Sequence, residues 1–225
     1  MFDKLRKISG EDPDHIHFVY HIAKPLFESW GYKVVILHSD RDYLDVFNHI
    51  MERPRKHMEH KGMKYGFSIS KRCSVKRDCK LRPINQYFKN IKEPYIQYLG
   101  ICIDEPTRLA SMHKNPNSIS LLEKYGYTEE MAKELCRQYN LLSPCYGASN
   151  KRQGCWFCPN SKLCEHRKIR ERQPEVWQQF LAMEKEPNLA NDKWNVFGKT
   201  LEEHEKILAL EEEKKRIWNN YIVVD

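Results

Sequence analysis

Four cysteines crowded into one short stretch constrain this chain more than any other feature. Cys145, Cys155, Cys158 and Cys164 follow the spacing C-x9-C-x2-C-x5-C and make up half of the eight cysteines in the 225 residues. Two thiolates in a C-x2-C turn can face one metal, and four thiolates complete either a tetrahedral zinc site or a 4Fe–4S cluster. The spacing therefore predicts a four-cysteine centre that organises the second half of the chain.

The identity of that centre stays open at this point. Structural zinc sites more often use two C-x2-C pairs, whereas one pair with outlying cysteines is typical of cluster proteins, so the pattern favours a 4Fe–4S cluster over Zn²⁺. A third interpretation is four unrelated buried thiols. His166 offers a substitute ligand, but with four cysteines available we expect it to be a bystander.

Composition indicates a globular, cytoplasmic protein. Hydrophobic residues make up 40% of the chain and charged residues 31%, and no apolar run approaches the ~20 residues of a membrane helix. The N-terminus has no secretory signal pattern. Clustered cysteines in such a chain are better explained as metal ligands than as a disulfide framework.

The positive charge is concentrated in one block. Residues 52–92 hold 13 Lys and Arg against 3 Asp and Glu, a local charge of +10 in a chain whose net charge is +7. Such a block attracts polyanions, namely nucleotide phosphates, sulfate esters or nucleic acid. The alternative is a solvated lysine-rich face.

The hydrophobic pattern predicts an α/β protein with an incomplete sheet. We expect a helix over 13–30 that Pro25 bends, strands over 34–37 and 95–103, and short helices over 42–51 and 83–89. From residue 118 the pattern is helical, over 120–125, 128–139, 175–185 and 201–218. We therefore expect an α/β part over 1–115 and a helical, metal-organised part over 116–225.

Three segments, in order along the chain, resemble the motifs of one family. They read Cys73-Ser-Val-Lys-Arg-Asp-Cys-Lys80-Leu-Arg-Pro83, Gly100-Ile-Cys-Ile-Asp104-Glu105-Pro-Thr-Arg108 and Arg152-Gln-Gly-Cys155-Trp-Phe-Cys158-Pro159. These are similar to segments of the phosphoadenosine phosphosulfate (PAPS) reductase family, and the last is common in phage and prophage members. The cysteine spacing is also similar to that of the sulfurtransferase of DNA phosphorothioation systems, a relative with a 4Fe–4S cluster.

The resemblance implies a Rossmann-like nucleotide alpha-hydrolase fold that binds ATP or an adenylyl sulfate. Asp104 and Glu105 are implied to orient a ribose or to help hold Mg²⁺, and Cys73 to lie near the nucleotide or cluster. The residues implied to contact the nucleotide are Lys80, Arg82, Asp104, Glu105, Arg108 and Arg152, and those implied to act in catalysis are Cys73, Lys80 and Arg108.

The chain also departs from the family pattern. It lacks the Ser-Gly-Gly-x-Asp-Ser pyrophosphate loop, since the nearest string, Ser9-Gly10-Glu11-Asp12, has no second glycine and no preceding strand. Residues 165–225 contain no redox cysteine, which argues against simple PAPS reduction. We therefore expect either a truncated or split gene product, with Met1 not necessarily the true start and a partner supplying the loop, or a chain that has lost nucleotide turnover.

Two functions follow from these observations. The first is a nucleotide-dependent oxidoreductase or sulfurtransferase of the PAPS reductase type, with Lys80, Arg82 and Arg108 around an anion and an iron–sulfur cofactor. The second is a non-catalytic nucleic-acid-binding or accessory module, in which residues 52–92 contact phosphates and the metal site is structural.

Overall fold

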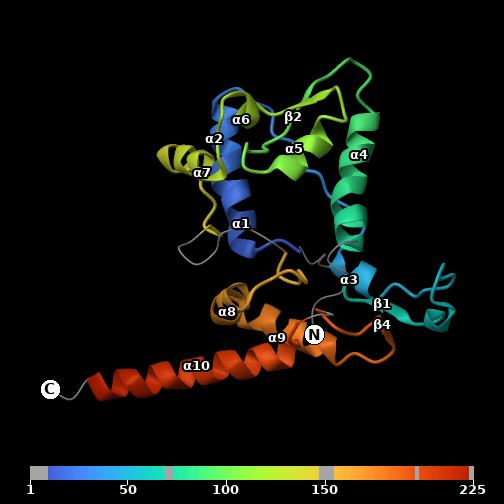
Figure 1. Cartoon of the computed structure of the whole chain (residues 1–225), viewed down its shortest axis with the longest axis vertical. Helices are drawn as coiled ribbons and strands as arrows, with labels where there is room; N and C mark the ends of the chain where they lie inside the picture. The colour runs from blue at the N-terminus through green and yellow to red at the C-terminus, as the bar shows by residue number, and fades with distance from the viewer. Residues whose placement is uncertain (1–9, 69–72, 147–154, 196–197, 223–225) are drawn as a thin grey trace. The chain divides into compact units, whose positions relative to one another are not determined.

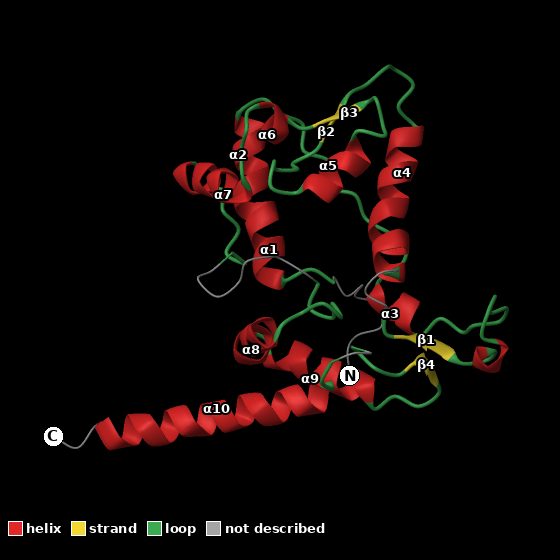
Figure 2. Ribbon diagram, viewed as in Figure 1, coloured by secondary structure: helices red, strands yellow, loops and turns green. Residues whose placement is uncertain are grey.

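The computed structural model describes residues 10–68, 73–146, 155–195 and 198–222, and the side chains of helix residues up to 218. Helices predominate, and the strands are short and few (Figures 1 and 2). The class is therefore mixed α/β. None of the described helices is long and apolar enough to cross a membrane.

The chain divides into two compact units that interleave along the sequence. Unit 1 comprises residues 1–13, 36–84 and 147–225, and unit 2 comprises residues 14–35 and 85–146. The sequence suggested one division near residue 115, whereas each compact unit draws on two or more separate segments.

Unit 1 is a helical layer packed on a short parallel strand pair. Helices α8, α9 and α10 contact one another, and α3 packs on β1. Strand β1 pairs with β4 in the register Lys64↔Leu189 and Gly66↔Asn191. The elements are α3 (Tyr43–Phe47), η2 (Met58–His60), β1 (Lys64–Gly66), η4 (Lys76–Leu81), α8 (Leu163–Arg172), α9 (Pro174–Glu184), β4 (Leu189–Asn191) and α10 (Leu201–Ile222).

One aromatic-rich core joins the separate segments of unit 1. It brings Tyr43, Phe47 and Phe67 from the first half of the chain against residues of the second half. The second-half members include Trp156, Phe157, Trp177, Phe180, Trp194 and Leu201, all nearly fully buried. Burial of this much aromatic surface is the main stabilising term for the unit.

Unit 2 contains a parallel β–α–β arrangement. Strands β2 and β3 pair in the register Gln97↔Ser118 and Tyr98↔Ile119, and α5 connects them. Ile101, Leu109 and Met112 form its small core. Its elements are α1 (Pro13–Phe18), η1 (Val19–Ala23), α2 (Lys24–Ser29), α4 (Arg82–Lys89, which begins in unit 1), β2 (Gln97–Tyr98), α5 (Pro106–Met112), β3 (Ser118–Ile119), α6 (Leu121–Lys124) and α7 (Glu129–Gln138).

The N-terminal helical segment follows the expectation. It runs from Pro13 to Ser29, and a five-residue π-helical stretch, Val19–Ala23, precedes Pro25. Because Pro25 has no N–H group, regular α-helical hydrogen bonding cannot continue there, and the N–H of Lys24 bonds to the Val19 carbonyl instead. Gly31 ends the segment with φ of +86°.

Three expected elements differ in the structure. Residues 34–37 form no strand, and Val35 and Leu37 are exposed, because no segment among the described residues pairs with them. The helix expected over 42–51 ends at Phe47, since Ile50 bridges Lys64. The strand expected over 95–103 is reduced to Gln97–Tyr98.

The shortening of that strand has a local cause. Its partner β3 stops at Ile119 because Ser120 caps the next helix, its hydroxyl accepting from the N–H of Glu123. The same hydroxyl donates to the Ile101 carbonyl at 2.7 Å, which ends the ladder. The segment is also less buried than expected, because Ile96 and Tyr98 are largely exposed while Ile101 is buried.

Candidate functional site

The two residues between Cys155 and Cys158 anchor the C-x2-C segment in the core of unit 1. Trp156 and Phe157 are 3% and 2% exposed. The Phe157 ring stacks on that of Tyr43 with centroids 3.4 Å apart, and Trp156 meets the Tyr43 ring edge-on at 5.4 Å. The segment is therefore held by its apolar residues, and its half-buried cysteines flank this anchor.

Gly10, the first described residue, also contacts the C-x2-C segment. The N–H of Trp156 donates to the Gly10 carbonyl at 3.2 Å. A Cβ at Gly10 would lie 2.6 Å from the Phe157 ring, so only glycine fits at this position. The sequence drew attention to Gly10 as part of a degenerate phosphate loop, whereas here it allows close packing.

Lys80 forms an ion pair with Glu11, and its positive charge acts on the Cys155 thiol. Burial lowers the pKa of Lys80, but charge on Cys155 and the Glu11 carboxylate raise it more, so the amine is cationic. Burial is the main cause that raises the pKa of Cys155 to about 11, and Lys80 opposes this rise.

Cys73 and Cys79 pack against the same core. The Cys73 sulfur accepts from the N–H of Lys76 at 3.3 Å, and the Cys79 thiol donates to the Asp42 carbonyl at 3.6 Å. Burial, followed by the nearby carboxylates of Asp78 and Asp42, raises the pKa of Cys79 to about 11. Cys79 is thus a protonated, structural thiol.

The predicted cysteine quartet falls in both units. Cys155, Cys158 and Cys164 belong to unit 1, whereas Cys145 belongs to unit 2. Within the described ranges, no three His, Cys, Asp or Glu side chains are grouped as metal ligands. Thiol donors suit iron–sulfur clusters and zinc by their chemistry. Arg152 lies outside the described residues.

His166 lies in the core between α8, α9 and α10. It is fully buried, and its ring contacts those of Trp177, Phe180 and Trp194. Its Nδ1 is 2.8 Å from Nδ1 of His204, so one ring donates and the other accepts. Burial, followed by the neighbouring His204, lowers the pKa of His166 to about 3.

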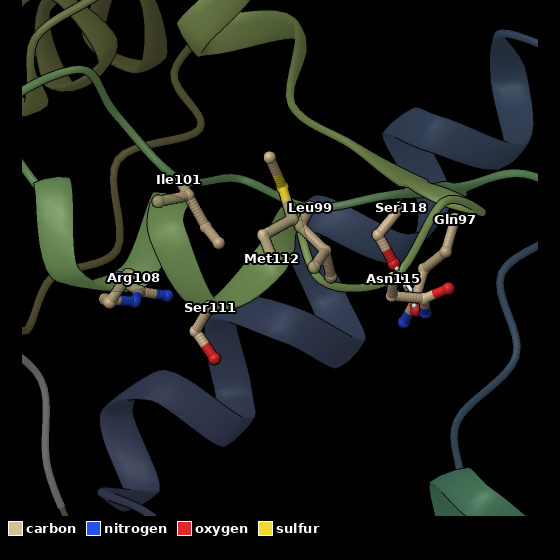
Figure 3. Close-up of a pocket in the computed structure, with 8 residues that line it drawn as sticks. All are labelled: Gln97, Leu99, Ile101, Arg108, Ser111, Met112, Asn115 and Ser118. Carbon is tan, nitrogen blue, oxygen red and sulfur yellow. Dashed lines mark hydrogen bonds between the residues drawn. The ribbon is translucent and has the colours of Figure 1, made fainter.

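Unit 2 has an open pocket of about 360 Å³ along β2 and α5 (Figure 3). Leu99, Ile101 and Met112 give it an apolar middle, with Arg108 and Ser111 toward one end (Figure 3). Its size is at the lower end of small-molecule sites.

Amide and hydroxyl groups form the other end of this pocket. The Asn115 amide donates to the Ser118 hydroxyl at 3.0 Å, and that hydroxyl donates to the Gln97 side-chain carbonyl at 3.4 Å (Figure 3). The pocket therefore combines hydrogen-bonding groups, an apolar surface and one guanidinium. A small ligand with an apolar ring and an anionic group would fit this chemistry.

The carboxylates expected to hold ribose or Mg²⁺ have structural partners. Asp104 accepts from the N–H of Glu129 at 3.1 Å and so caps α7. Glu105 accepts from the N–H of Cys102 at 3.3 Å and forms an ion pair with Arg108. The Arg108 side chain is 60% exposed.

The predicted site residues thus form two groups. Cys73, Lys80 and Arg82 lie in unit 1 with three of the four cysteines, and Asp104, Glu105 and Arg108 lie in unit 2 beside the pocket. Sequence reasoning missed Tyr43 and Glu11, which contact the C-x2-C segment and Lys80. Trp156 and Phe157, the two residues between Cys155 and Cys158, were the signal in the sequence that this motif packs against a buried aromatic ring.

Comparison with known proteins adds no assignment. No family model matches this chain, and no curated protein or solved structure matches it.

Proposed function

We propose that this protein binds an adenylylated or sulfonated nucleotide and holds an iron–sulfur cluster, as an enzyme of the PAPS reductase type. The observation that carries the proposal is that Cys73 and Cys79 of the first family-like motif pack on the same core as Cys155 of the third, although the motifs are far apart in sequence. Lys80 of the first motif also pairs with Glu11, whose neighbour Gly10 accepts from the N–H of Trp156 in the third. The parallel β2–α5–β3 arrangement supports an incomplete Rossmann-like sheet.

In this proposal Cys145, Cys155, Cys158 and Cys164 hold the cluster, with Zn²⁺ as the alternative. When bound, the cluster would stabilise the local fold or carry electrons. Lys80 and Arg82 attract the sulfate or phosphate, and Arg108 attracts an anionic group at the unit 2 pocket. Asp104 and Glu105 are the proposed Mg²⁺ ligands, and the ion would have to replace the N–H of Glu129 at Asp104 and Arg108 at Glu105.

Nucleotide binding is tested by calorimetry with ATP and adenosine phosphosulfate on the reconstituted protein. Lys80→Ala should weaken binding by about ten- to a hundredfold, the value of a hydrogen bond to a charged group. Lys76→Ala is the matched control, because Lys76 lies in the same π-helical segment and forms no ion pair within the described residues. Equal affinities for the two variants would exclude the role of Lys80.

The cofactor is tested by anaerobic purification and iron, sulfide and zinc analysis. Cys155→Ser together with Cys158→Ser should abolish the visible absorbance and the bound metal. Cys136→Ser is the control, since Cys136 lies on α7 outside the quartet. Stoichiometric zinc without iron would select the alternative metal, and metal retention by the double variant would refute the ligand assignment.

A second function is favoured by a specific observation on unit 1. Residues 50–64 form a hairpin-like loop. It is closed by the Ile50↔Lys64 bridge and by a hydrogen bond from the N–H of Met51 to the Met63 carbonyl. Four exposed cations on it form no ion pair within the described residues: Arg53, Arg55, Lys56 and Lys61. Elsewhere several Lys and Arg side chains are paired, as in Arg167–Glu211 and Arg137–Glu134.

Unpaired cations on a projecting loop suit the phosphates of a nucleic acid. The test is fluorescence anisotropy with duplex DNA over a range of salt concentrations. Replacing the four cations by alanine should reduce the salt slope by about 0.9 for each phosphate that the loop no longer neutralises. Alanine at four paired cations (Lys24, Lys133, Arg137 and Lys206) is the charge-matched control, and an equal weakening in both variants would indicate net charge alone.

A further inference from the structure

Helix α10 packs on the rest of unit 1 through one side only. Leu201, His204 and Leu208 are buried on that side, and the helix contacts α8 and α9. Its C-terminal half extends past both of these helices (Figure 1). Because an α-helix turns about 100° per residue, Leu210 and Ile217 lie on the side away from this contact, two turns apart. Their side chains are 57% and 47% exposed.

Two opposite charges lie between these apolar residues on the same face. Leu210, Glu213, Lys214 and Ile217 stand at positions i, i+3, i+4 and i+7, which form one continuous strip along a helix, here called the α10 strip. Glu213 and Lys214 are exposed, and neither forms an ion pair within the described residues. The two preceding glutamates, in contrast, pair with arginines of α8. The strip therefore presents one unpaired charge of each sign between two exposed apolar side chains.

The order of residues along the α10 strip is self-complementary. The chain reads Leu210-Glu-Glu-Glu-Lys-Lys-Arg-Ile217, so the charges reverse sign about the midpoint of this segment. If a second copy of the helix lies antiparallel across that midpoint, Glu213 of each copy faces Lys214 of the other. The same two-fold symmetry brings Leu210 of each copy to Ile217 of the other. A parallel pair in register would instead place like charges opposite each other.

We propose that the α10 strip is the contact surface of a homodimer in which the α10 helices of two copies pair antiparallel. The partner is a second copy of this chain, because the strip is complementary to itself in both charge and apolar residues. Each ion pair between the copies is flanked by Leu210 and Ile217, which partly exclude water and strengthen it relative to an exposed pair. The strip covers only two helical turns, so the dimer is weak and depends on protein concentration.

The test is sedimentation of the full-length chain over a range of concentrations, with charge reversals in the strip. Glu213→Lys brings two pairs of lysines together in the dimer, and Lys214→Glu brings two pairs of glutamates together. Each variant alone should raise the dimer dissociation constant by about tenfold or more. An equal mixture of the two variants should restore association, because every charge contact between unlike chains is again Glu against Lys. The double variant should also associate like the wild type.

Lys215→Glu is the matched control, because it makes the same change of charge at the next residue. Lys215 is exposed and follows Leu208 by two turns, so it lies on the other side of α10 from the strip. It should leave the dissociation constant unchanged, and far-UV circular dichroism should show that all variants keep their helices.

A wild-type protein that stays monomeric up to about 1 mM overturns the inference, since weaker association is not specific pairing. A dimer that neither single reversal weakens forms through another surface and also overturns it. Failure of the mixed variants to associate would exclude the antiparallel contact between Glu213 and Lys214.

Discussion

Replacing His166 should remove a large part of the acid sensitivity of unit 1. His166 is fully buried, and its pKa is lowered to about 3 by burial and by His204, against about 6.5 for an exposed histidine. Between these values the unfolded chain binds a proton that the folded chain does not. Stability from this residue is therefore complete above about pH 6.5 and is lost as the pH falls toward 3.

The magnitude follows from the difference between the two pKa values. One pKa unit corresponds to about 1.4 kcal/mol, so the full loss at pH 3 is about 5 kcal/mol, and the loss between pH 7 and pH 5 is about 2 kcal/mol. The groups around the His166 ring do not reverse the direction of this pH dependence. Burial and Lys199 lower the pKa of His204, against a smaller opposite effect of Glu203, so His204 also resists protonation.

The assay is urea unfolding at pH 7 and pH 5, followed by tryptophan fluorescence. Trp156, Trp177 and Trp194 lie in the core of unit 1 and report its unfolding. In His166→Asn the side-chain amide can replace Nδ1 beside His204 but does not titrate. We expect this variant to be less stable at pH 7 and to lose about 2 kcal/mol less than the wild type on acidification.

His57→Asn is the control, because His57 lies in the same unit and its side chain is 66% exposed. It should show the wild-type pH dependence. An equal loss of stability in His166→Asn and the wild type would refute the assignment of the acid sensitivity to His166.

Three further predictions concern stability and are checked by the same urea unfolding. Gly66→Ala should destabilise unit 1 by about 2 kcal/mol or more, because Gly66 has φ of +78° and a Cβ there would clash with the Asn191 carbonyl. Gly100→Ala is the control and should cost under about 1 kcal/mol, because a Cβ at Gly100 would meet no atom within 4 Å. Asp42→Ala should cost about 1 kcal/mol through loss of the capping box, and an unchanged midpoint would contradict this. Trp177→Phe removes the indole bond to the Glu205 carboxylate and should cost about 1–3 kcal/mol, whereas Trp218→Phe, 69% exposed, should have no effect.

Local signals in the sequence predicted most of the helices, but not α5 or α8. The helix predicted over 128–139 is α7, which Thr128 caps by accepting from the N–H of Met131. Pro25 marked the distortion of the first helical segment. Short-range rules succeed here because a helix makes its hydrogen bonds within a few residues.

Strands and the site were harder to predict because both depend on distant partners. Residues 34–37 have strand composition but no pairing strand in the described part of the chain. The segment 95–103 pairs with β3 only as far as Ser120, whose hydroxyl bonds to the Ile101 carbonyl. The cysteine spacing indicated a ligand set but not its surroundings. Nothing local to Tyr43 indicates that its ring stacks on Phe157, since that contact joins segments more than a hundred residues apart.

The interleaved order of unit 1 has a consequence for synthesis on the ribosome. Tyr43, Phe47 and Phe67 leave the exit tunnel long before Trp177, Phe180 and Leu201, the residues that bury them. The growing polypeptide therefore carries exposed aromatic surface until translation is almost complete, a state prone to aggregation and suited to chaperone capture. Unit 2, whose last residue is Tyr146, can fold earlier, before the carboxyl-terminal helices of unit 1 have been synthesised.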